Sequence, residues 1–331
     1  MKIWVYAEQK ADGLASVVAE LLGEARRIAQ GNDEVGAVLI GHEVEDIARE
    51  TICLGADKVY VADNTDLKIY NNETYSRILE HLAREENPDI VLIGATSVGG
   101  DLAPTLAARL GTGVAAHCVG LKINADGHLV QIVPSFGGKV MAEILCPVHR
   151  PQMATIKSGV FEPGERQGAS SGQVISVDVA EILQSYQPRI EALGVHCRPP
   201  EGKPLEQAEV VVAGGWGIGS QEDWQLIENL AAALDGAVGC TRPALDEGWA
   251  AGEHMMIGTS GKTIKPKVYV GIGISGAAHH LCGMKDAGTI ISINNDAKAA
   301  IFDVSDIKVV EDFKKIVPLL IQKLQSSVCN L

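Results

Sequence analysis

The stretch EVVVAGGWGIGS, from Glu209 to Ser220, leads from a run of valines into a glycine-rich turn. An apolar run bounded by a turn is typical of a parallel strand that is buried on both faces. The glycines permit a tight turn, and the pattern from about Gln221 to Leu234 predicts an amphipathic helix. A strand, a turn and a helix in this order indicate a βαβ series, with free N–H groups where the helix begins. A glycine-rich turn without any ligand fits this stretch alone equally well.

The same rhythm of apolar runs and amphipathic stretches occupies both halves of the chain. It predicts an α/β fold with two doubly wound parallel-sheet domains. The predicted strands are residues 3–7, 37–40, 58–62, 89–95, 209–215, 266–274 and 289–294. The predicted helices are residues 16–30, 44–53, 73–86, 101–110 and 221–234, a helix from about 276, and a terminal helix ending near 325.

Turn signals in the middle of the chain predict an antiparallel extension of the first sheet. Asp126-Gly127 and Gly137-Gly138 separate apolar stretches in the way that hairpin turns do. From about Gly164 to Pro204 the chain is rich in Gly, Ser, Gln and Pro, which indicates a linker that a short helix or strand interrupts. We therefore expect an N-terminal domain over residues 1–200, with the linker from about 164, and a C-terminal domain over residues 205–331.

Composition excludes several classes of function. The formal net charge of −14 argues against binding to nucleic acid or to anionic membranes, which depends on excess Lys and Arg. The seven cysteines are odd in number and contain no Cys-x-x-Cys pair, so neither a disulfide framework nor a metal site is predicted. We expect neither a leader segment, because no basic region precedes an apolar stretch near Met1, nor a membrane span, because no apolar run reaches roughly 20 residues. We expect a cytoplasmic protein.

Three further motifs contain polar residues next to glycine. The stretch IGTSGKT, residues 257–263, is similar to a phosphate loop, but Ile257 stands where that loop has its first Gly, so an NTPase is rejected. The stretch GIGISGAAHH ends in two adjacent histidines, of which at most one faces a ligand on a helix. Arg242, after the short run Gly239-Cys240-Thr241, presents a planar cation. Taken alone, the histidine motif is also compatible with a structural His, and the motif at Arg242 is equally compatible with an ordinary surface Arg.

Together and in this order, the motifs resemble the C-terminal domain of the electron-transfer flavoprotein alpha subunit. The resemblance runs from GGWGIGS through CTRPALDEGW, IGTSGK and GISGAAHHLCGMKD to ISINNDAKAAIF. Upstream, IGATSVGGDLAPTLAARLGTGVAAHCVGL and FGGKVMAEILCPVHRPQMATIKSGVF resemble the N-terminal domain of the same family. The resemblance covers roughly residues 90–325.

The resemblance implies an FAD site in the C-terminal domain. Thr241 and Arg242 would lie beside the isoalloxazine, residues 258–260 would pass its N5 edge, and His280 would lie near the C2 carbonyl. There a positive or hydrogen-bonding imidazole would stabilise the reduced flavin, as would Arg242. The FAD-binding residues that the resemblance implies are Trp216, Thr241, Arg242, Ile257, Gly258, Thr259, Ser260, Ser275, Gly276, Ala277, Ala278, His279, His280, Asn294, Asn295 and Asp312, the last three of them for the adenosine part.

The sequence departs from this family at three implied site positions. Trp216 stands where the family usually has Arg, so a cation on the pyrophosphate side is lost or replaced by aromatic stacking. Thr259 stands where Gln is frequent, and Asn295 where Lys is frequent. The polar contacts at two edges of the cofactor are therefore thinner than usual.

The function that the resemblance implies is electron transfer without bond-making catalysis. The chain would bind FAD, pair with a smaller beta subunit, and carry electrons between an acyl-CoA dehydrogenase-type flavoenzyme and a second redox partner, as in fatty acid beta-oxidation. A subunit of an NADH-dependent electron-bifurcating complex and a flavin-free nucleotide-binding module remain as alternatives. A nicotinamide-dependent dehydrogenase is disfavoured because Asp235, the acidic residue expected at the ribose, does not stand at a clean strand end.

Overall fold

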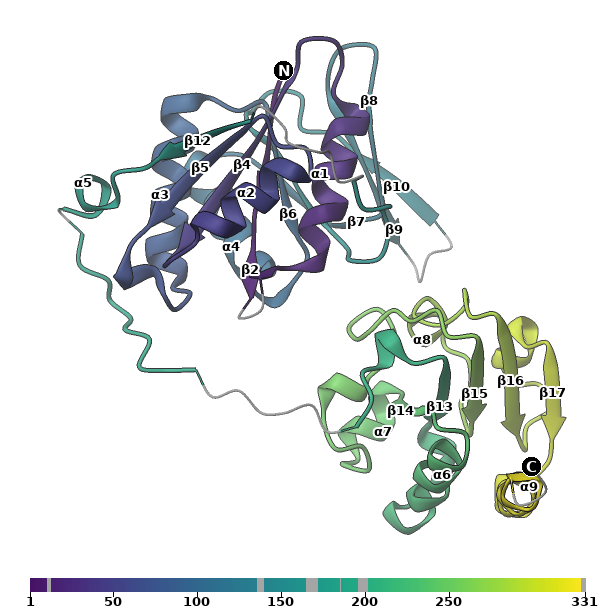
Figure 1. Ribbon diagram of the computed structural model, residues 1–331. Helices are drawn as coiled ribbons and strands as arrows, with labels where there is room; N and C mark the ends of the chain where they lie inside the picture. The colour runs from purple at the N-terminus through teal and green to yellow at the C-terminus, as the bar shows by residue number, and fades with distance from the viewer. Residues whose placement is uncertain (11–12, 136–139, 165–171, 185, 196–201, 329–331) are drawn as a thin grey trace. The chain divides into compact units, whose positions relative to one another are not determined.

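The computed structural model describes residues 1–10, 13–135, 140–164, 172–184, 186–195 and 202–328. These residues divide into two compact units (Figure 1), the first containing the described residues within 1–135 and 141–195 and the second containing Val140 and the described residues within 202–328. Within the described residues, no helix is both long enough and apolar enough to cross a membrane.

The first unit is built on a parallel sheet whose strand order is β12-β5-β4-β1-β6-β11-β7. From β1 the chain moves outward to β4 and β5 on one side and then returns to β6 on the other, which is doubly wound topology. The predicted fold class is confirmed for this half. The strands are β1 (Lys2–Tyr6), β4 (Glu34–Gly41), β5 (Lys58–Asp63), β6 (Ile90–Gly94), β7 (Val114–Cys118), β11 (Gln152–Ile156) and β12 (Gln173–Ser176).

Helices cover both faces of this sheet. Apolar residues of α1 and α2 pack in the core on one face, and those of α3, α4 and α5 pack on the other. Helix α4 begins at Ser97, four residues before the predicted start at Asp101, because the hydroxyl of Thr96 accepts the N–H of Gly99 at 2.9 Å and caps the helix. The helices are α1 (Ser16–Ile28), α2 (Glu45–Cys53), η1 (Thr65–Leu67), α3 (Asn72–Glu86), α4 (Ser97–Leu110) and α5 (Val179–Leu183).

The predicted antiparallel extension is present in the first unit. Strand β8 pairs with β9 in antiparallel register, and the turn between them includes Gly127 with a φ of 76°. The Gly137-Gly138 turn lies outside the described residues. The extension consists of β8 (Gly120–Ile123), β9 (Leu129–Ser135) and β10 (Val140–Ile144), and a separate small hairpin consists of β2 (Gln9–Lys10) and β3 (Gly13–Leu14).

The second unit contains another parallel sheet, of order β14-β13-β15-β16-β17. The chain goes from β13 to β14 on one side and then to β15 on the other, so this half is also doubly wound. The strands are β13 (Val210–Gly214), β14 (Ala237–Cys240), β15 (Val268–Ile272), β16 (Thr289–Asn294) and β17 (Ile307–Val310). The helices are η3 (Leu205–Gln207), η4 (Trp216–Ile218), α6 (Gln221–Ala233), α7 (Arg242–Asp246), η5 (Glu253–Met255), α8 (Ala278–Leu281), η6 (Ala300–Val304) and α9 (Phe313–Val328).

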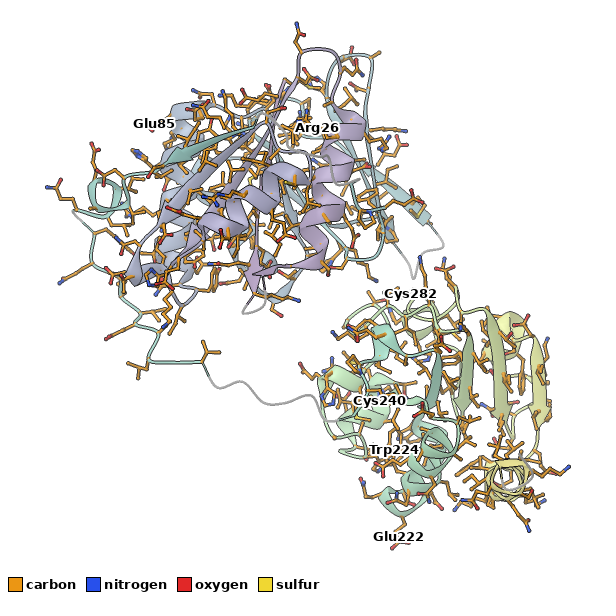
Figure 2. All side chains as sticks on the ribbon, viewed as in Figure 1. Arg26, Glu85, Glu222, Trp224, Cys240 and Cys282 are labelled. Carbon is orange, nitrogen blue, oxygen red and sulfur yellow. The ribbon has the colours of Figure 1, made fainter. Side chains whose placement is uncertain are left out.

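The two faces of this second sheet are covered differently. On one face, α6 and α9 contribute Trp224, Leu230 and Val317 to the core. On the other, the predicted helix from about Gly276 is reduced to the short α8, and loops supply Ile257 and Ile264 instead. Figure 2 labels Trp224 on the α6 side of the sheet and Cys282 on the α8 side.

Candidate functional site

The order in which the chain adds strands to the second sheet reverses between β13 and β15. The chain leaves β13 toward β14 and comes back on the opposite side at β15, and open α/β sheets bind ligands at the carboxyl ends of strands beside such a switch point. Most of the predicted site residues follow these strand ends. Trp216 follows β13, Thr241 and Arg242 follow β14, Ser275 follows β15, and Asn295 follows β16.

A cavity of about 270 Å³ lies at this edge. It contains three of the predicted residues, Asn294, Asn295 and Asp312, brought together from the ends of β16 and β17. The other lining residues, which were not on the predicted list, are Gly217, Ile218, Gly273, Ile293, Glu311, Phe313 and Lys314.

Several polar groups of the cavity already have hydrogen-bond or ion-pair partners within the second unit. The amide of Asn294 donates to the carbonyl of Ile274 at 2.9 Å, and a carboxylate oxygen of Asp312 accepts the N–H of Lys314 at 2.9 Å. The ammonium of Lys314 lies 2.8 Å from a carboxylate oxygen of Asp223, and this contact raises the pKa of Lys314. The cation at the wall of the cavity is therefore already paired.

Two glycines let the turns after β13 and β15 approach each other. The N–H of Gly217 donates to the carbonyl of Gly273 at 2.9 Å. A Cβ on Gly217 would lie 2.7 Å from that carbonyl oxygen, so a side chain here would push the two turns apart. The cavity wall depends on glycine at these positions.

Residues 257–260 lie against α8. The N–H of Ile257 donates to the carbonyl of Cys240 at 2.9 Å, and the N–H of Thr259 donates to the carbonyl of His279 at 2.8 Å. The Thr259 hydroxyl also lies 3.0 Å from the thiol of Cys282. The structure thus brings predicted residues 257–260 and 277–280 together, as the resemblance implies for one site.

The two adjacent histidines have opposite environments. The side chain of His279 is exposed, whereas His280 is buried, with Nδ1 at 3.1 Å from the carbonyl of Ile257 and Nε2 at 2.7 Å from the hydroxyl of Tyr269. Burial lowers the pKa of His280 to about 4. His280 is therefore neutral near pH 7, and both of its ring nitrogens are occupied.

Several donors at this edge have no acceptor within the described residues. The backbone N–H groups of Ser275, Gly276 and Ala277 make no hydrogen bond there. The hydroxyl of Thr241 is buried and likewise lacks a partner in the described part of the chain. A buried hydroxyl without a partner is costly, so these groups suit a ligand that accepts hydrogen bonds.

Trp216 and Arg242 stand apart from the other predicted residues. The indole N–H of Trp216 donates to Glu247 at 3.2 Å, and the guanidinium of Arg242 pairs with Asp246 at 2.8 Å. Both side chains are exposed, and no hydrogen bond in the described part of the chain links either one to the remaining predicted residues.

Tyr269 and Glu247 are contact residues that the sequence reasoning missed. Tyr269 lies two and four residues before Gly271 and Gly273, so the alternation of a strand could have placed it on the face that meets α8. Glu247 ends α7 and gave no comparable signal, because its contact with Trp216 depends on how the turns after β13 and β14 fold.

Comparison with known proteins agrees with this architecture. The model of the "Electron transfer flavoprotein domain" matches residues 3–182, and that of the "Electron transfer flavoprotein FAD-binding domain" matches residues 204–285. The chain belongs to the electron-transfer flavoprotein alpha subunit family. The resemblance inferred from the sequence is confirmed, and family membership implies a role in electron transfer.

Similar proteins have several names. The chain is 44% identical to the electron transfer flavoprotein subunit alpha of Thermoanaerobacterium thermosaccharolyticum over 98% of this chain and 97% of that protein. It is 38% identical to the acryloyl-CoA reductase electron transfer subunit beta of Anaerotignum propionicum over 98% and 95%. It is 36% identical to subunit LctC of a lactate dehydrogenase (NAD(+),ferredoxin) of Acetobacterium woodii over 99% and 78%.

Proposed function

We propose that this chain is the FAD-binding alpha subunit of an electron-transfer flavoprotein. In this proposal, residues 205–331 form the FAD-binding domain, and residues 1–200 form the domain that docks a beta subunit. The heterodimer carries electrons between an acyl-CoA dehydrogenase-type flavoenzyme and a second redox partner in the cytoplasm. The observation that carries the proposal is the cavity at the switch point of the second sheet, together with the free donors beside it.

The cavity suits the adenosine end of FAD. Its volume of about 270 Å³ is below the ~300–1,000 Å³ of pockets that enclose a whole drug-sized ligand, so it fits one end of a dinucleotide. A carboxylate beyond a strand end, here Asp312, accepts hydrogen bonds from ribose hydroxyls, and the amide of Asn295 offers further contacts. Gly217 and Gly273 let the two turns that form part of the cavity wall approach closely.

The free donors suit the middle and the flavin end of the cofactor. The successive N–H groups of residues 275–277, which have no acceptor in the described part of the chain, suit phosphate oxygens or ring carbonyls. The unpartnered hydroxyl of Thr241 and the loop at Gly258, Thr259 and Ser260 add neutral polar contacts. FAD, when bound, supplies the redox centre, and these residues bind and orient it.

Arg242 and His280 differ in the charge that they offer. Reduction adds negative charge to the flavin ring, so the permanent cation of Arg242 favours the reduced form. The neutral ring of His280 contributes no charge, and both of its nitrogens already have partners in Tyr269 and Ile257. We therefore assign the positive electrostatic contribution to Arg242. The contact of His280 with the flavin C2 carbonyl stays a prediction.

An exposed apolar surface on the first unit supports docking of a beta subunit. The side chains of Met141, Leu145 and Val148, on and after β10, are 51%, 47% and 79% exposed. Strand β10 is also an edge of its small sheet. Exposed apolar side chains at and beyond an edge strand are typical of a surface that a partner protein covers.

A second function is favoured by the names of the relatives. One similar protein is a subunit of a lactate dehydrogenase (NAD(+),ferredoxin), so an NADH-dependent electron-bifurcating complex is the alternative for this chain. In that case the beta subunit would hold a second FAD. Two FAD per heterodimer and reduction of the flavin by NADH would favour this alternative over a simple carrier.

The proposal is tested by coexpressing the chain with the beta subunit and recording the visible absorption spectrum of the purified complex during stepwise anaerobic reduction. We expect flavin bands that bleach as electrons are added and return when an acceptor is supplied. A colourless complex that takes up no added FAD would contradict the proposal and favour a flavin-free nucleotide-binding module.

A further inference from the structure

His280 links three elements of the second unit. Its Nε2 lies 2.7 Å from the hydroxyl of Tyr269 on β15, and its Nδ1 lies 3.1 Å from the carbonyl oxygen of Ile257. His280 itself is on α8. Tyr269 is completely buried and His280 is 6% exposed, so the chain of contacts is shielded from water.

The partners of the ring determine where its proton resides. A carbonyl oxygen only accepts hydrogen bonds, so Nδ1 must carry a hydrogen and donate it to Ile257. A neutral imidazole has one such hydrogen, so Nε2 accepts, and the hydroxyl of Tyr269 donates to it.

Burial is the main influence on the protonation of the ring. The titratable neighbours are Tyr269 and, near Tyr269, Cys240 on β14, and burial raises the pKa of both groups, so both are neutral. Burial also lowers the pKa of His280, and the hydrogen bond to Ile257 raises it by less.

The carbonyl that accepts this hydrogen bond begins the loop at 257–260. The N–H of Ile257 donates to the end of β14 at Cys240, and the N–H of Thr259 donates to the carbonyl of His279 on α8. A Cβ on Gly258 would lie 2.4 Å from that same carbonyl oxygen, so backbone meets backbone here. The position of the loop therefore depends on α8, and the ring of His280 fixes one to the other.

We propose that His280 is a positioning residue for the FAD site. Its Nδ1–H tautomer, selected by the carbonyl of Ile257 and compatible with donation from the hydroxyl of Tyr269, holds that carbonyl and thereby sets the position of residues 258–260 toward the flavin. This inference rests on the proposed function, because that loop is part of the proposed FAD site.

The tautomer is read directly by nitrogen NMR of the full chain with its beta subunit, labelled at histidine and measured with and without FAD. The His280 signals are assigned by their loss in His280→Asn. We expect a neutral ring with the proton on Nδ1 from about pH 8 down to about pH 5, well below the ordinary histidine pKa. A proton on Nε2, or titration of His280 within this range, would overturn the inference.

Two variants of His280 distinguish the role of Nδ1 from the role of Nε2. In His280→Asn the side-chain amide lies where Nδ1 was and keeps the donor to Ile257, whereas in His280→Gln the amide reaches the position of Nε2. We expect the Asn variant to keep FAD affinity within about threefold and the Gln variant to lose about tenfold, the effect of one hydrogen bond. The opposite order would mean that Nε2 contacts the flavin directly, and the positioning role would be wrong.

Two more measurements keep the outcome independent of FAD binding. Hydrogen exchange at the amide of Thr259 reports the loop without cofactor, and we expect it to be faster in His280→Gln than in His280→Asn. Equal exchange in both variants would overturn the inference. In Tyr269→Phe the carbonyl of Ile257 still requires a hydrogen on Nδ1, so we expect the same tautomer, and appearance of the second tautomer would overturn the inference. Failure of every form, wild type included, to bind FAD would contradict the proposed function, while NMR and hydrogen exchange would still decide the role of His280.

Discussion

The indole N–H of Trp216 donates to the carboxylate of Glu247 at 3.2 Å, which joins the turn after β13 to the end of α7. The side chain of Trp216 is 65% exposed, although its neighbours Gly217 and Ile218 line the cavity. The contact thus holds an exposed aromatic ring next in sequence to two cavity residues, and under the proposed function this ring is available to stack on a planar group of the cofactor.

Replacement of Trp216 by Ala is expected to weaken FAD binding by about three- to tenfold, because an aromatic stack contributes about 0.5–1.5 kcal/mol. Trp216→Phe keeps a ring and should retain most of the affinity. FAD titration followed by quenching of flavin fluorescence measures both. Equal affinities for the Ala and Phe variants would show that the ring does not contact the cofactor.

Replacement of Arg242 by Ala is expected to lower the flavin potential. Arg242 is exposed and ion-paired with Asp246, so its loss removes one screened positive charge near the ring and should lower the potential by only on the order of 20 mV for a two-electron couple. Anaerobic potentiometry measures the shift, which should shrink at high salt. Arg49→Ala, which removes a similarly exposed ion-paired cation from the first unit, should leave the potential unchanged.

The buried His280 predicts a loss of stability in acid. Its pKa is about 4 in the folded chain, below the ordinary 6.5, so the unfolded chain binds the proton first as the pH falls. The free energy of unfolding of the second unit should therefore fall between about pH 6.5 and about pH 4, by on the order of 3 kcal/mol. Urea unfolding at several pH values measures this slope, which should be absent in His280→Asn. An equal slope in the variant would assign the loss to another group.

Glu73 on α3 attaches the segment that follows α5. Its carboxylate accepts the backbone N–H of Arg189 at 2.7 Å and the side-chain Nε at 2.8 Å, while Arg77 stacks on Tyr186. The hydrogen bond from the Arg189 backbone, followed by that from Tyr186, lowers the pKa of Glu73 to about 2. This contribution to stability is therefore complete above the ordinary pKa of 4.5 and is lost as the pH falls toward about 2.

Release of this attachment should expose the bond after Arg189 to trypsin. We expect several-fold faster cleavage there in Glu73→Gln at neutral pH, because proteolysis follows the population of the open segment. Glu80→Gln breaks ion pairs on the same helix and serves as the control. Equal cleavage in both variants would mean that Glu73 does not hold the segment.

A charge on the apolar surface at β10 should weaken pairing with the beta subunit. We expect Leu145→Asp to raise the dissociation constant of the heterodimer by more than about tenfold, because a buried unpaired carboxylate is costly. Val174→Asp places the same charge on β12, at a side chain that is equally exposed, and should leave pairing unchanged. Analytical ultracentrifugation distinguishes the two results.

Sequence patterns predicted the fold because both sheets consist of buried apolar strands separated by helices. They missed β11, where Pro151 and Gln152 interrupt the apolar pattern, although the strand lies between β6 and β7. They also placed the start of α4 too late, at Asp101, whereas the Thr96 cap makes Gly99 and Gly100 part of the helix.

The candidate site was predictable in outline and not in detail. The rule that two adjacent histidines cannot share a helix face correctly separated His279 from His280. Which of them is buried depends on Tyr269 and Ile257, whose contacts with the ring cross long distances in sequence. The cavity residues Glu311 and Lys314 were missed because β17 has no glycine-rich turn to mark its end.

The most direct test of FAD binding at the switch point is reconstitution of the cofactor-free heterodimer with FAD, measured by calorimetry for the wild type and for Gly217→Ala. The cavity and the close contact of Gly217 with Gly273 predict that the wild type takes up FAD in equimolar amount and that the Ala variant, while folded, binds it at least about tenfold more weakly. A folded wild-type complex that binds no FAD, or equal affinity in the two proteins, would contradict an FAD site at this edge of the sheet.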